Sequence, residues 1–381
     1  MNRPNFIARR EHYGWLIFNI KSRQIQRGNA GNVQKLIQQG ASVRVITNSL
    51  VPGALSAPIK VFLDITNHCN LQCIHCLSSS QPQSRTHLSF DIIQAVVNEC
   101  RESGVFMIKI GGGEPLLRKD IWDIVHFIWS QGMAISMSTN GTILTEQIIT
   151  NLRRFDVDIS VSIDGDEATH NAIRGEGVYQ KAIRTLQRFK SSGINPSIRF
   201  TMMNINIRTV PHVVRLARSL DLRLKVRRLK PRGRAVKNDL IINSPTKEYL
   251  EALDILNATE KCEIEDIMNF QGSIRSHLLL GPNDCGAGTR SVHINFNGDV
   301  SPCIFLGPDF VDGNIQQTSL MDIWRNGVKM QILRNLPLND QCSMCDRKFT
   351  CHAECPAIRL YLTGSLHGDD PGCLNVLRRL K

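Results

Sequence analysis

The chain has 381 residues, and its 46 Lys and Arg against 34 Asp and Glu give a formal net charge of +12. Hydrophobic residues make up 42% and charged residues 21%, which is typical of a globular protein and excludes a disordered chain. No apolar run approaches the roughly 18–20 residues that a membrane-spanning helix needs, and residues 1–4 do not open a signal peptide. We therefore expect a cytoplasmic protein without a membrane partner, in which metal binding explains the high count of 12 cysteines better than disulfides do.

Residues 1–57 precede the first regular repeat and are predicted to form a short appendage. Residues 11–19 are predicted to be a strand and residues 32–39 a short helix. Trp15 and Phe18 would suit a flap that packs on the main domain.

Between residues 58 and 240 the chain alternates short β-branched runs with amphipathic stretches. The runs predict strands at 61–66, 105–110, 134–138, 158–163, 196–203 and 223–229. The amphipathic stretches predict helices at about 90–102, 119–130, 146–154, 178–192 and 208–220. This spacing is typical of a parallel sheet with right-handed crossovers. Six strands fall short of the eight of a closed TIM barrel, so the predicted fold is α/β with an open, partial (β/α)6 barrel.

Two further regions complete the predicted organisation. Residues 241–281 are expected to be a bridging helical segment, and residues 282–381 a separate cysteine-rich domain. Within 58–240, polar turns follow four of the predicted strands, at residues 111–115, 139–141, 164–165 and 231–234. In parallel barrels this rim carries the chemistry. Gly112 and Gly113 would let a ligand approach the backbone, and the Glu114 carboxylate would hold an ammonium group, which predicts a cofactor site at the top of the barrel.

Three cysteines, Cys69, Cys73 and Cys76, lie close together directly after the first predicted strand. Three thiolates on one loop can hold a [4Fe–4S] cluster and leave one iron open for a ligand. A structural zinc site needs four ligands, and His68 or His75 would complete such a set. The spacing of these cysteines alone leaves both metals open.

Seven more cysteines lie in the last hundred residues. They are Cys285, Cys303, Cys342, Cys345, Cys351, Cys355 and Cys373. A zinc ribbon is the ordinary explanation of a C-x2-C pair, but seven thiolates do not divide into closed sets of four. The two remaining cysteines, Cys100 and Cys262, are isolated, and we interpret them as packed side chains rather than ligands.

The order CxxxCxxC, GGEP, STNG, SIDG and PxGR resembles the radical S-adenosylmethionine (SAM) enzymes over residues 58–240. The resemblance implies that Cys69, Cys73 and Cys76 hold a [4Fe–4S] cluster whose open iron binds SAM. Cleavage of SAM then gives a 5′-deoxyadenosyl radical that abstracts hydrogen from the substrate. The resemblance also implies SAM contacts from His75, Gly112, Gly113, Glu114, Ser138, Asn140, Ser162, Asp164, Arg174 and Leu229.

The spacing of the C-terminal cysteines resembles the SPASM extension of the same enzymes, which implies two auxiliary [4Fe–4S] clusters. Cys342, Cys345, Cys351 and Cys373 would close the outer cluster. Cys285, Cys303 and Cys355 would hold the inner cluster and leave one iron open, unless an unmatched residue completes it.

Several strings resemble the mycofactocin maturases and related enzymes that excise tyramine, among them residues 76–80, 110–115, 285–288 and 362–364. This likeness implies modification of a ribosomally made precursor peptide at or next to a tyrosine, by tyramine excision, decarboxylation or crosslinking. Sulfatase maturases are the alternative group. They carry an Asp base at the position of Ile304, so formylglycine chemistry is in doubt and no general base is assigned from the sequence.

The partners expected from this resemblance are a precursor peptide and a flavodoxin or ferredoxin-type electron donor. Residues 1–57 resemble the N-terminal segments of peptide maturases, which implies a remnant of a peptide-recognition fold as an equally good alternative to a packed flap. Because these residues are short for a complete recognition domain, we also expect a separate protein that presents the peptide by strand addition. The basic run 223–237 raises the alternative of a zinc-bearing nucleic-acid-binding protein. The run has no interleaved aromatics, and we expect no nucleic-acid partner.

Overall fold

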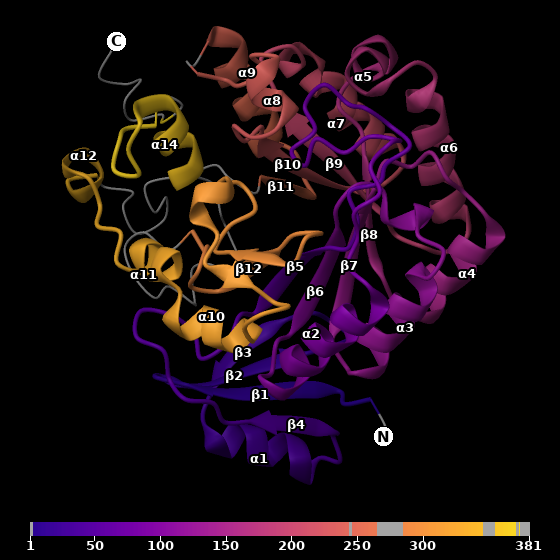
Figure 1. The fold of residues 1–381 in the computed structure, drawn as a ribbon. Helices are drawn as coiled ribbons and strands as arrows, with labels where there is room; N and C mark the ends of the chain where they lie inside the picture. The colour runs from indigo at the N-terminus through magenta and orange to yellow at the C-terminus, as the bar shows by residue number, and fades with distance from the viewer. Residues whose placement is uncertain (1–2, 244–245, 265–284, 346–354, 371–372, 374–381) are drawn as a thin grey trace.

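The computed structural model describes residues 3–243, 246–264, 285–345, 355–370 and 373 (Figure 1). Cys351 and residues 265–281 of the predicted bridging segment therefore lie outside the described residues. None of the helices in these described ranges is long and apolar enough to cross a membrane.

Six parallel strands form the centre of the fold and follow one another across the sheet in chain order. They are β5 (Lys60–Asp64), β6 (Met107–Gly111), β7 (Ala134–Thr139), β8 (Asp158–Ser162), β9 (Ser197–Met202) and β10 (Arg223–Arg228). The helices that connect them are α2 (Phe90–Glu102), α3 (Ile121–Ser130), α4 (Glu146–Arg154), α6 (Val178–Ser191) and α7 (Val210–Ser219). The prediction of an open α/β partial barrel is confirmed.

Local capping explains why the helix bounds follow so closely from the sequence. The α4 helix begins after Thr145, whose hydroxyl accepts a hydrogen bond from the backbone N–H of Ile148. The apolar face of α4 then buries Ile148, Ile149 and Leu152 against the sheet. Such faces, together with the apolar strands, form one continuous core that also buries Cys100, as predicted.

The sheet is wider than predicted because short strands from later segments join both edges. The strand β11 (Cys262–Ile264) pairs in parallel with β10 inside the region predicted to be helical. At the other edge, β12 (Ser291–Ile294) pairs in parallel with β5, and β13 (Asp299–Ser301) and β14 (Gly313–Asn314) continue the sheet in antiparallel pairing to ten strands. Strands of two to four residues carry too little alternation to be predicted. The helix α5 (Glu167–Arg174) was also missed.

The remaining helices of the second half are short. The turn after β10 leads into α8 (Arg234–Lys237). The bridging region holds α9 (Lys247–Asn257), and the cysteine-rich region holds α10 (Leu320–Asn326), α11 (Val328–Arg334), α12 (Asp340–Ser343) and α14 (Pro356–Thr363). Single-turn 3₁₀ segments occur at Pro115–Leu117, Ile207–Thr209 and Pro308–Phe310. Figure 1 shows α10, α11, α12 and α14 beside the β12 edge, away from the barrel helices α3, α4 and α6.

The N-terminal appendage is a small sheet of its own, below the barrel in Figure 1. It consists of β1 (Phe6–Glu11), β2 (Gly14–Asn19), β3 (Ile25–Gly28), α1 (Ala30–Gln38) and β4 (Val43–Ile46), with strand order β3-β2-β1-β4. Only β2 and α1 were predicted. Phe18 stacks on Phe106 of the barrel at a ring-centroid distance of 5.0 Å. The guanidinium of Arg9 reaches the carbonyl oxygens of Pro58 and Gly104, so the small sheet packs firmly on the barrel.

Candidate active site

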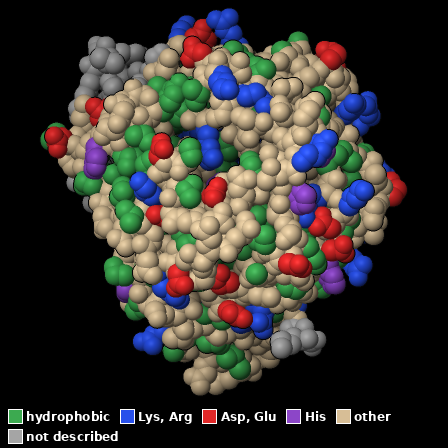
Figure 2. Space-filling model, viewed as in Figure 1, with side chains coloured by type: hydrophobic (Ala, Val, Ile, Leu, Met, Phe, Trp, Pro, Cys, Tyr) green, Lys and Arg blue, Asp and Glu red, His purple; other side chains and the backbone are tan. Residues whose placement is uncertain are grey.

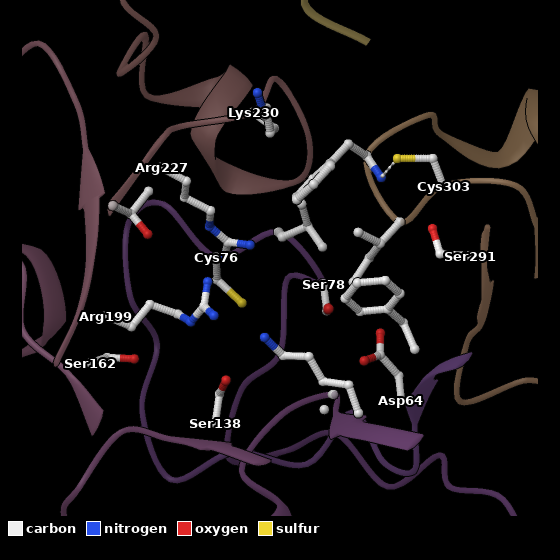
Figure 3. Close-up of a pocket in the computed structure, with 18 of the residues that line it drawn as sticks. Asp64, Cys76, Ser78, Ser138, Ser162, Arg199, Arg227, Lys230, Ser291 and Cys303 are labelled. Atoms are coloured by element: carbon white, nitrogen blue, oxygen red, sulfur yellow. Dashed lines mark hydrogen bonds between the residues drawn. The ribbon is translucent and has the colours of Figure 1, made fainter. Parts of the chain in front are cut away.

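One cavity of about 600 Å³ extends from Lys60 and Met107, at the starts of β5 and β6, to the loops that follow the carboxyl ends of the central strands (Figure 3). The first cysteine group contributes Cys69, Cys73 and Cys76 to its wall, and the second group contributes Cys285, Cys303 and Cys355. The sequence predicts two separate cysteine sites. The structure opens these six side chains onto one shared space, because β12 pairs with β5 and carries the second group to the rim of the barrel.

The three-cysteine loop is held by the turn that follows β10. The Arg234 guanidinium donates hydrogen bonds to the carbonyl oxygens of Cys73 (2.7 Å) and Ser80 (2.8 Å), and its backbone N–H donates to the carbonyl of Cys76 (3.0 Å). Gly233 lies so close to the cysteine loop that a Cβ on it would be 2.4 Å from the carbonyl oxygen of Cys76, and its own φ is +62°. The sequence shows this turn only as a basic motif, and its role as a clamp was missed.

The glycines after β6 have a further physical reason besides the predicted approach of a ligand. A Cβ at Gly112 would lie 2.1 Å from the carbonyl oxygen of Thr66, and one at Gly113 would lie 2.0 Å from that of His68. The turn therefore packs against the backbone that leads into the cysteine loop. Both glycines are required by this close approach of two protein segments, and both still line the cavity.

Glu114 is a buried carboxylate with an ordered set of donors. Its side chain is 1% exposed and accepts hydrogen bonds from the Thr139 hydroxyl (2.9 Å) and the backbone N–H of Asn140 (2.8 Å). Burial raises the pKa of Glu114 to about 7, although these donors oppose the shift. A cationic ligand in the cavity would therefore favour the charged form of Glu114.

A second buried group lies behind the cysteine loop. Asp164 is fully buried, and its Oδ2 accepts a hydrogen bond of 2.7 Å from Nε of Arg174 and lies 3.4 Å from Nε2 of His75. Burial alone would raise the pKa of Asp164, but the Arg174 charge lowers it to about 2. Burial lowers the pKa of His75 to about 4, so this imidazole is neutral at pH 7.

The structure places most of the predicted SAM contacts on the wall of the cavity near the three cysteines. These are His75, Gly112, Gly113, Glu114, Ser138, Asn140, Ser162, Arg174 and Leu229. Asp164 is the exception, because it has no surface on the cavity and lies behind Arg174.

The described cysteines of the second group lie in two neighbourhoods. Cys285 and Cys355 are close enough to Cys303 that their charges, together with burial, raise the pKa of its thiol. Cys342 has Cys345 and Cys373 as its cysteine neighbours, and burial raises its pKa to about 11. This division matches the predicted inner and outer sets as far as the described residues extend.

Arg359 of α14 lies beside the outer neighbourhood and was missed by the sequence analysis. Its charge lowers the pKa of Cys342, opposing the effect of burial. The side chain is 1% exposed, and none of its three guanidinium nitrogens has a hydrogen-bond partner in the described part of the chain. A buried guanidinium without a partner is costly. An anionic group held by the neighbouring cysteines would supply that partner.

Charged side chains on the cavity wall are mostly basic, seven Lys or Arg against three Asp or Glu. Figure 2 shows Lys and Arg side chains in and around the hollow on this face. Some side chains of the basic run 223–237 form ion pairs within the protein. Arg223 and Lys225 pair with Asp158, and Arg228 pairs with the buried Asp370 in the segment before Cys373.

Comparison with known families agrees with this geometry. Residues 63–220 match the radical SAM superfamily, and residues 285–346 match the iron–sulfur cluster-binding SPASM domain. The chain belongs to the radical SAM superfamily and is a radical SAM enzyme with a SPASM domain. The family predicted from the motif order is confirmed.

Three known proteins are similar to this chain in sequence or in fold. The chain is 31% identical over 327 residues to mycofactocin maturase MftC of Mycobacterium tuberculosis, a match that covers 84% of each chain. It is 27% identical over 341 residues to an AdoMet-dependent heme synthase of Methanosarcina barkeri, covering 84% of this chain and 97% of the relative. Its fold is similar to that of Streptococcus suis SuiB bound to precursor peptide SuiA, with a TM-score of 0.73 and 16% identity over 97% and 99% of the two chains.

The residues present fit the cofactors of this family. Cys69, Cys73 and Cys76 come from one loop and line one cavity, and three thiolates leave one iron of a [4Fe–4S] cluster open. The Glu114 carboxylate lies on the same wall and suits the ammonium group of SAM. At the C-terminal cysteines, the guanidinium of Arg359 suits the negative charge that a thiolate-bound cluster carries.

Proposed function

We propose that this enzyme is a maturase that oxidises a ribosomally made precursor peptide at or next to a tyrosine, by tyramine excision, decarboxylation or crosslinking. The observation that carries the proposal is the shared cavity, in which the first cysteine group and three cysteines of the second face one space. A substrate in this space lies between two redox centres, as a two-electron oxidation of a peptide requires. The similarity to mycofactocin maturase and the fold of SuiB, which was solved with a precursor peptide, support a peptide substrate.

We assign the cofactors to the two cysteine groups on the cavity wall. Cys69, Cys73 and Cys76 hold the cluster that binds SAM. Glu114 holds the SAM ammonium, and Arg174 binds the SAM carboxylate while Asp164 fixes the guanidinium from behind. The remaining SAM contacts come from His75, Gly112, Gly113, Ser138, Asn140, Ser162 and Leu229. When bound, the cluster and SAM supply the radical chemistry that removes a hydrogen atom from the substrate.

The auxiliary clusters are assigned to the C-terminal cysteines. Cys285, Cys303 and Cys355 hold the inner cluster, which faces the cavity. Cys342, Cys345, Cys351 and Cys373 hold the outer cluster, which lies nearer the surface and accepts or delivers electrons through a flavodoxin or ferredoxin-type partner. Arg359 compensates the charge of the outer cluster.

The N-terminal sheet is proposed to help deliver the peptide. β3 is an edge strand of that sheet, and Ile25 at its start lines the main cavity. A peptide that adds a strand to β3 would have its next residues directed toward the cavity. We propose that a separate small recognition protein presents the precursor. Tight binding of the precursor by this chain alone in a titration would contradict that part of the proposal.

The first test uses anaerobically purified protein with reconstituted clusters, SAM and dithionite. We expect 5′-deoxyadenosine formation that increases when a tyrosine-containing precursor peptide encoded beside the gene is added. The mass change of the peptide identifies the reaction: a loss of carbon dioxide together with two hydrogens means oxidative decarboxylation, and a loss of the tyramine unit means excision. Iron content of about twelve per chain would support three clusters.

A second candidate function follows from the basic wall of the cavity and the similarity to an AdoMet-dependent heme synthase. Carboxylates of a porphyrin would pair with the same Lys and Arg side chains that would otherwise receive an acidic peptide. The assay therefore includes an iron porphyrin that carries propionate groups. Loss of carbon dioxide from the porphyrin, with no change of the peptide, would replace the first proposal by the second.

A further inference from the structure

Asp64 is a buried carboxylate that the sequence analysis did not single out. It ends β5, immediately before the cysteine loop, and its side chain points into the cavity from the β5 side (Figure 3). The residue is only 4% exposed. The neighbouring strand leaves space for it, because a Cβ at Gly111 would lie 2.7 Å from the Asp64 Oδ1. The carboxylate therefore occupies a fixed position between the two cysteine groups.

A histidine from the C-terminal region holds this carboxylate. Nε2 of His293 lies 3.0 Å from Oδ2 of Asp64, and Nδ1 lies 3.3 Å from the hydroxyl of Ser301. That hydroxyl also lies 3.3 Å from the carbonyl oxygen of Cys303. His293 is 2% exposed and Ser301 5% exposed, so the chain of contacts runs from the cavity into the protein interior.

The side chains of Asp64, His293 and Ser301 can keep their hydrogen bonds in two different arrangements. When Asp64 is charged, His293 donates from Nε2 to the carboxylate, and the Ser301 hydroxyl donates to Nδ1. When Asp64 carries a proton, it donates to Nε2, Nδ1 donates to Ser301, and the hydroxyl turns to the carbonyl of Cys303. No buried polar atom of the three side chains loses its partner in either arrangement. The three side chains therefore stay hydrogen-bonded whether or not the carboxylate carries a proton.

Asp64 is also the acid on the wall best placed for such a role. Glu114 is already fixed by three donors at the SAM end of the cavity, and Glu263 is an exposed residue of β11. Ile304, which lies where sulfatase maturases carry an acid, lines the same cavity as Asp64 and cannot accept a proton.

We propose that Asp64, held by His293, accepts the proton that the substrate loses as its carbon radical is oxidised. The inference rests on the proposed function. Hydrogen abstraction leaves an unpaired electron on a substrate carbon. An oxidised iron–sulfur cluster then takes one electron. Either the phenolic O–H bond of the tyrosine, which is conjugated with the radical carbon through the ring, or an N–H bond next to that carbon breaks, and the electron pair of the broken bond completes the new double bond. The proton moves to the Asp64 carboxylate, so the substrate loses two electrons and two hydrogens in total.

The test compares Asp64→Asn with the wild-type holoenzyme and with Asp123→Asn, which removes one exposed carboxylate from α3. Asn has nearly the size of Asp and can still hydrogen-bond His293, but it cannot accept the proton. Each protein is given SAM, dithionite and the tyrosine-containing precursor deuterated at tyrosine. The measurements are peptide affinity by fluorescence anisotropy, cluster spectra by electron paramagnetic resonance, deuterium in 5′-deoxyadenosine, and modified peptide by mass spectrometry.

We expect Asp64→Asn to bind peptide and form deuterated 5′-deoxyadenosine as the wild type does, with unchanged cluster spectra. Product formation should fall by about 10²-fold or more, the usual contribution of a positioned base. A carbon-centred peptide radical should accumulate in freeze-quenched samples. Asp123→Asn should match the wild type in every readout.

Three results would overturn the proposal. Product formation at the wild-type rate would show that Asp64 is not the base. Altered cluster spectra or weakened peptide binding would show that the Asp64–His293 pair only joins β5 to β12. If the wild-type enzyme neither transfers deuterium from the peptide nor modifies it, the proposed function fails and this inference fails with it.

Discussion

The Arg234 guanidinium donates a hydrogen bond of 2.7 Å to the carbonyl oxygen of Cys73 and a second of 2.8 Å to that of Ser80. One side chain therefore joins the two ends of the loop that carries Cys73 and Cys76. The loop's own hydrogen bonds are few, such as the one from the N–H of Cys76 to the carbonyl of Cys73. Its shape thus depends on a residue that lies more than 150 positions later in the chain.

Replacing Arg234 by Met should loosen the cysteine loop. The substitution keeps much of the apolar stem but leaves two carbonyl oxygens without their donor, which costs about 1–3 kcal/mol for each group that stays buried. We expect purified Arg234→Met to hold about four fewer irons per chain, the content of one cubane cluster. Metal analysis after identical reconstitution measures this. Lys237→Ala, at an exposed position of the same basic run, is the matched control. Full iron content in Arg234→Met would contradict the clamp.

SAM affinity should depend on pH through Glu114. Burial raises the pKa of Glu114 to about 7, so the side chain is mostly protonated below that pH. The ammonium of SAM favours the carboxylate form. Binding therefore releases a proton, and the affinity should rise with pH up to about 7, by at most about tenfold per pH unit. Calorimetry between pH 5.5 and 7.5 in two buffers of different ionisation enthalpy measures the affinity for SAM and the number of protons released on binding.

The variant Glu114→Gln supplies the control for this pH dependence. The amide cannot titrate, so the affinity should be lower and nearly constant between pH 5.5 and 7. A wild-type affinity that does not change over the same interval would contradict the assignment of Glu114 to the ammonium group.

The sequence predictions were accurate where the contacts that determine an element lie close together along the chain. The bounds of α2 and α4 were predicted correctly because Ser89 and Thr145 cap them and the apolar period is clear. The strands β11 and β12 were missed because they are stabilised by pairing with distant strands. In the site, the grouping of Cys69, Cys73 and Cys76 on one loop follows from their spacing, whereas their assignment to a cluster comes from the order of the motifs. The burial of Asp164 behind Arg174, and the meeting of Asp64 with His293, depend on the folded arrangement and have no signature in the sequence.

The contact between Phe18 and Phe106 should carry much of the docking of the N-terminal sheet. Both rings are fully buried, and they stack at 5.0 Å between centroids. Phe18→Ala should lower the free energy of unfolding by about 3–5 kcal/mol, the usual cost of such a truncation in a packed core. Chemical denaturation measures the change. Ile37→Ala on α1, where the side chain is 50% exposed, should change it by less than about 0.5 kcal/mol. Equal effects of the two variants would contradict the docking.

Arg359 should tune the outer cluster, if Cys342, Cys345, Cys351 and Cys373 are its ligands. A cluster bound by four thiolates is anionic, and reduction adds a further negative charge. A buried cation beside Cys342 therefore stabilises the reduced form more than the oxidised form and raises the reduction potential. Arg359→Leu keeps an apolar side chain in the same space but removes that charge. The potential of the outer cluster should fall by on the order of 60 mV, a factor of ten in a one-electron equilibrium.

A redox titration followed by electron paramagnetic resonance measures this potential in the reconstituted protein. Arg153→Leu removes the same charge from an exposed position of α4 and should leave the potential unchanged. If Arg359→Leu kept both its iron and the wild-type potential, the guanidinium would have no electrostatic role at the cluster. If it lost about four irons, the charge would be needed to retain the cluster rather than to tune it. These two outcomes can be distinguished because the iron content and the reduction potential are determined on the same sample.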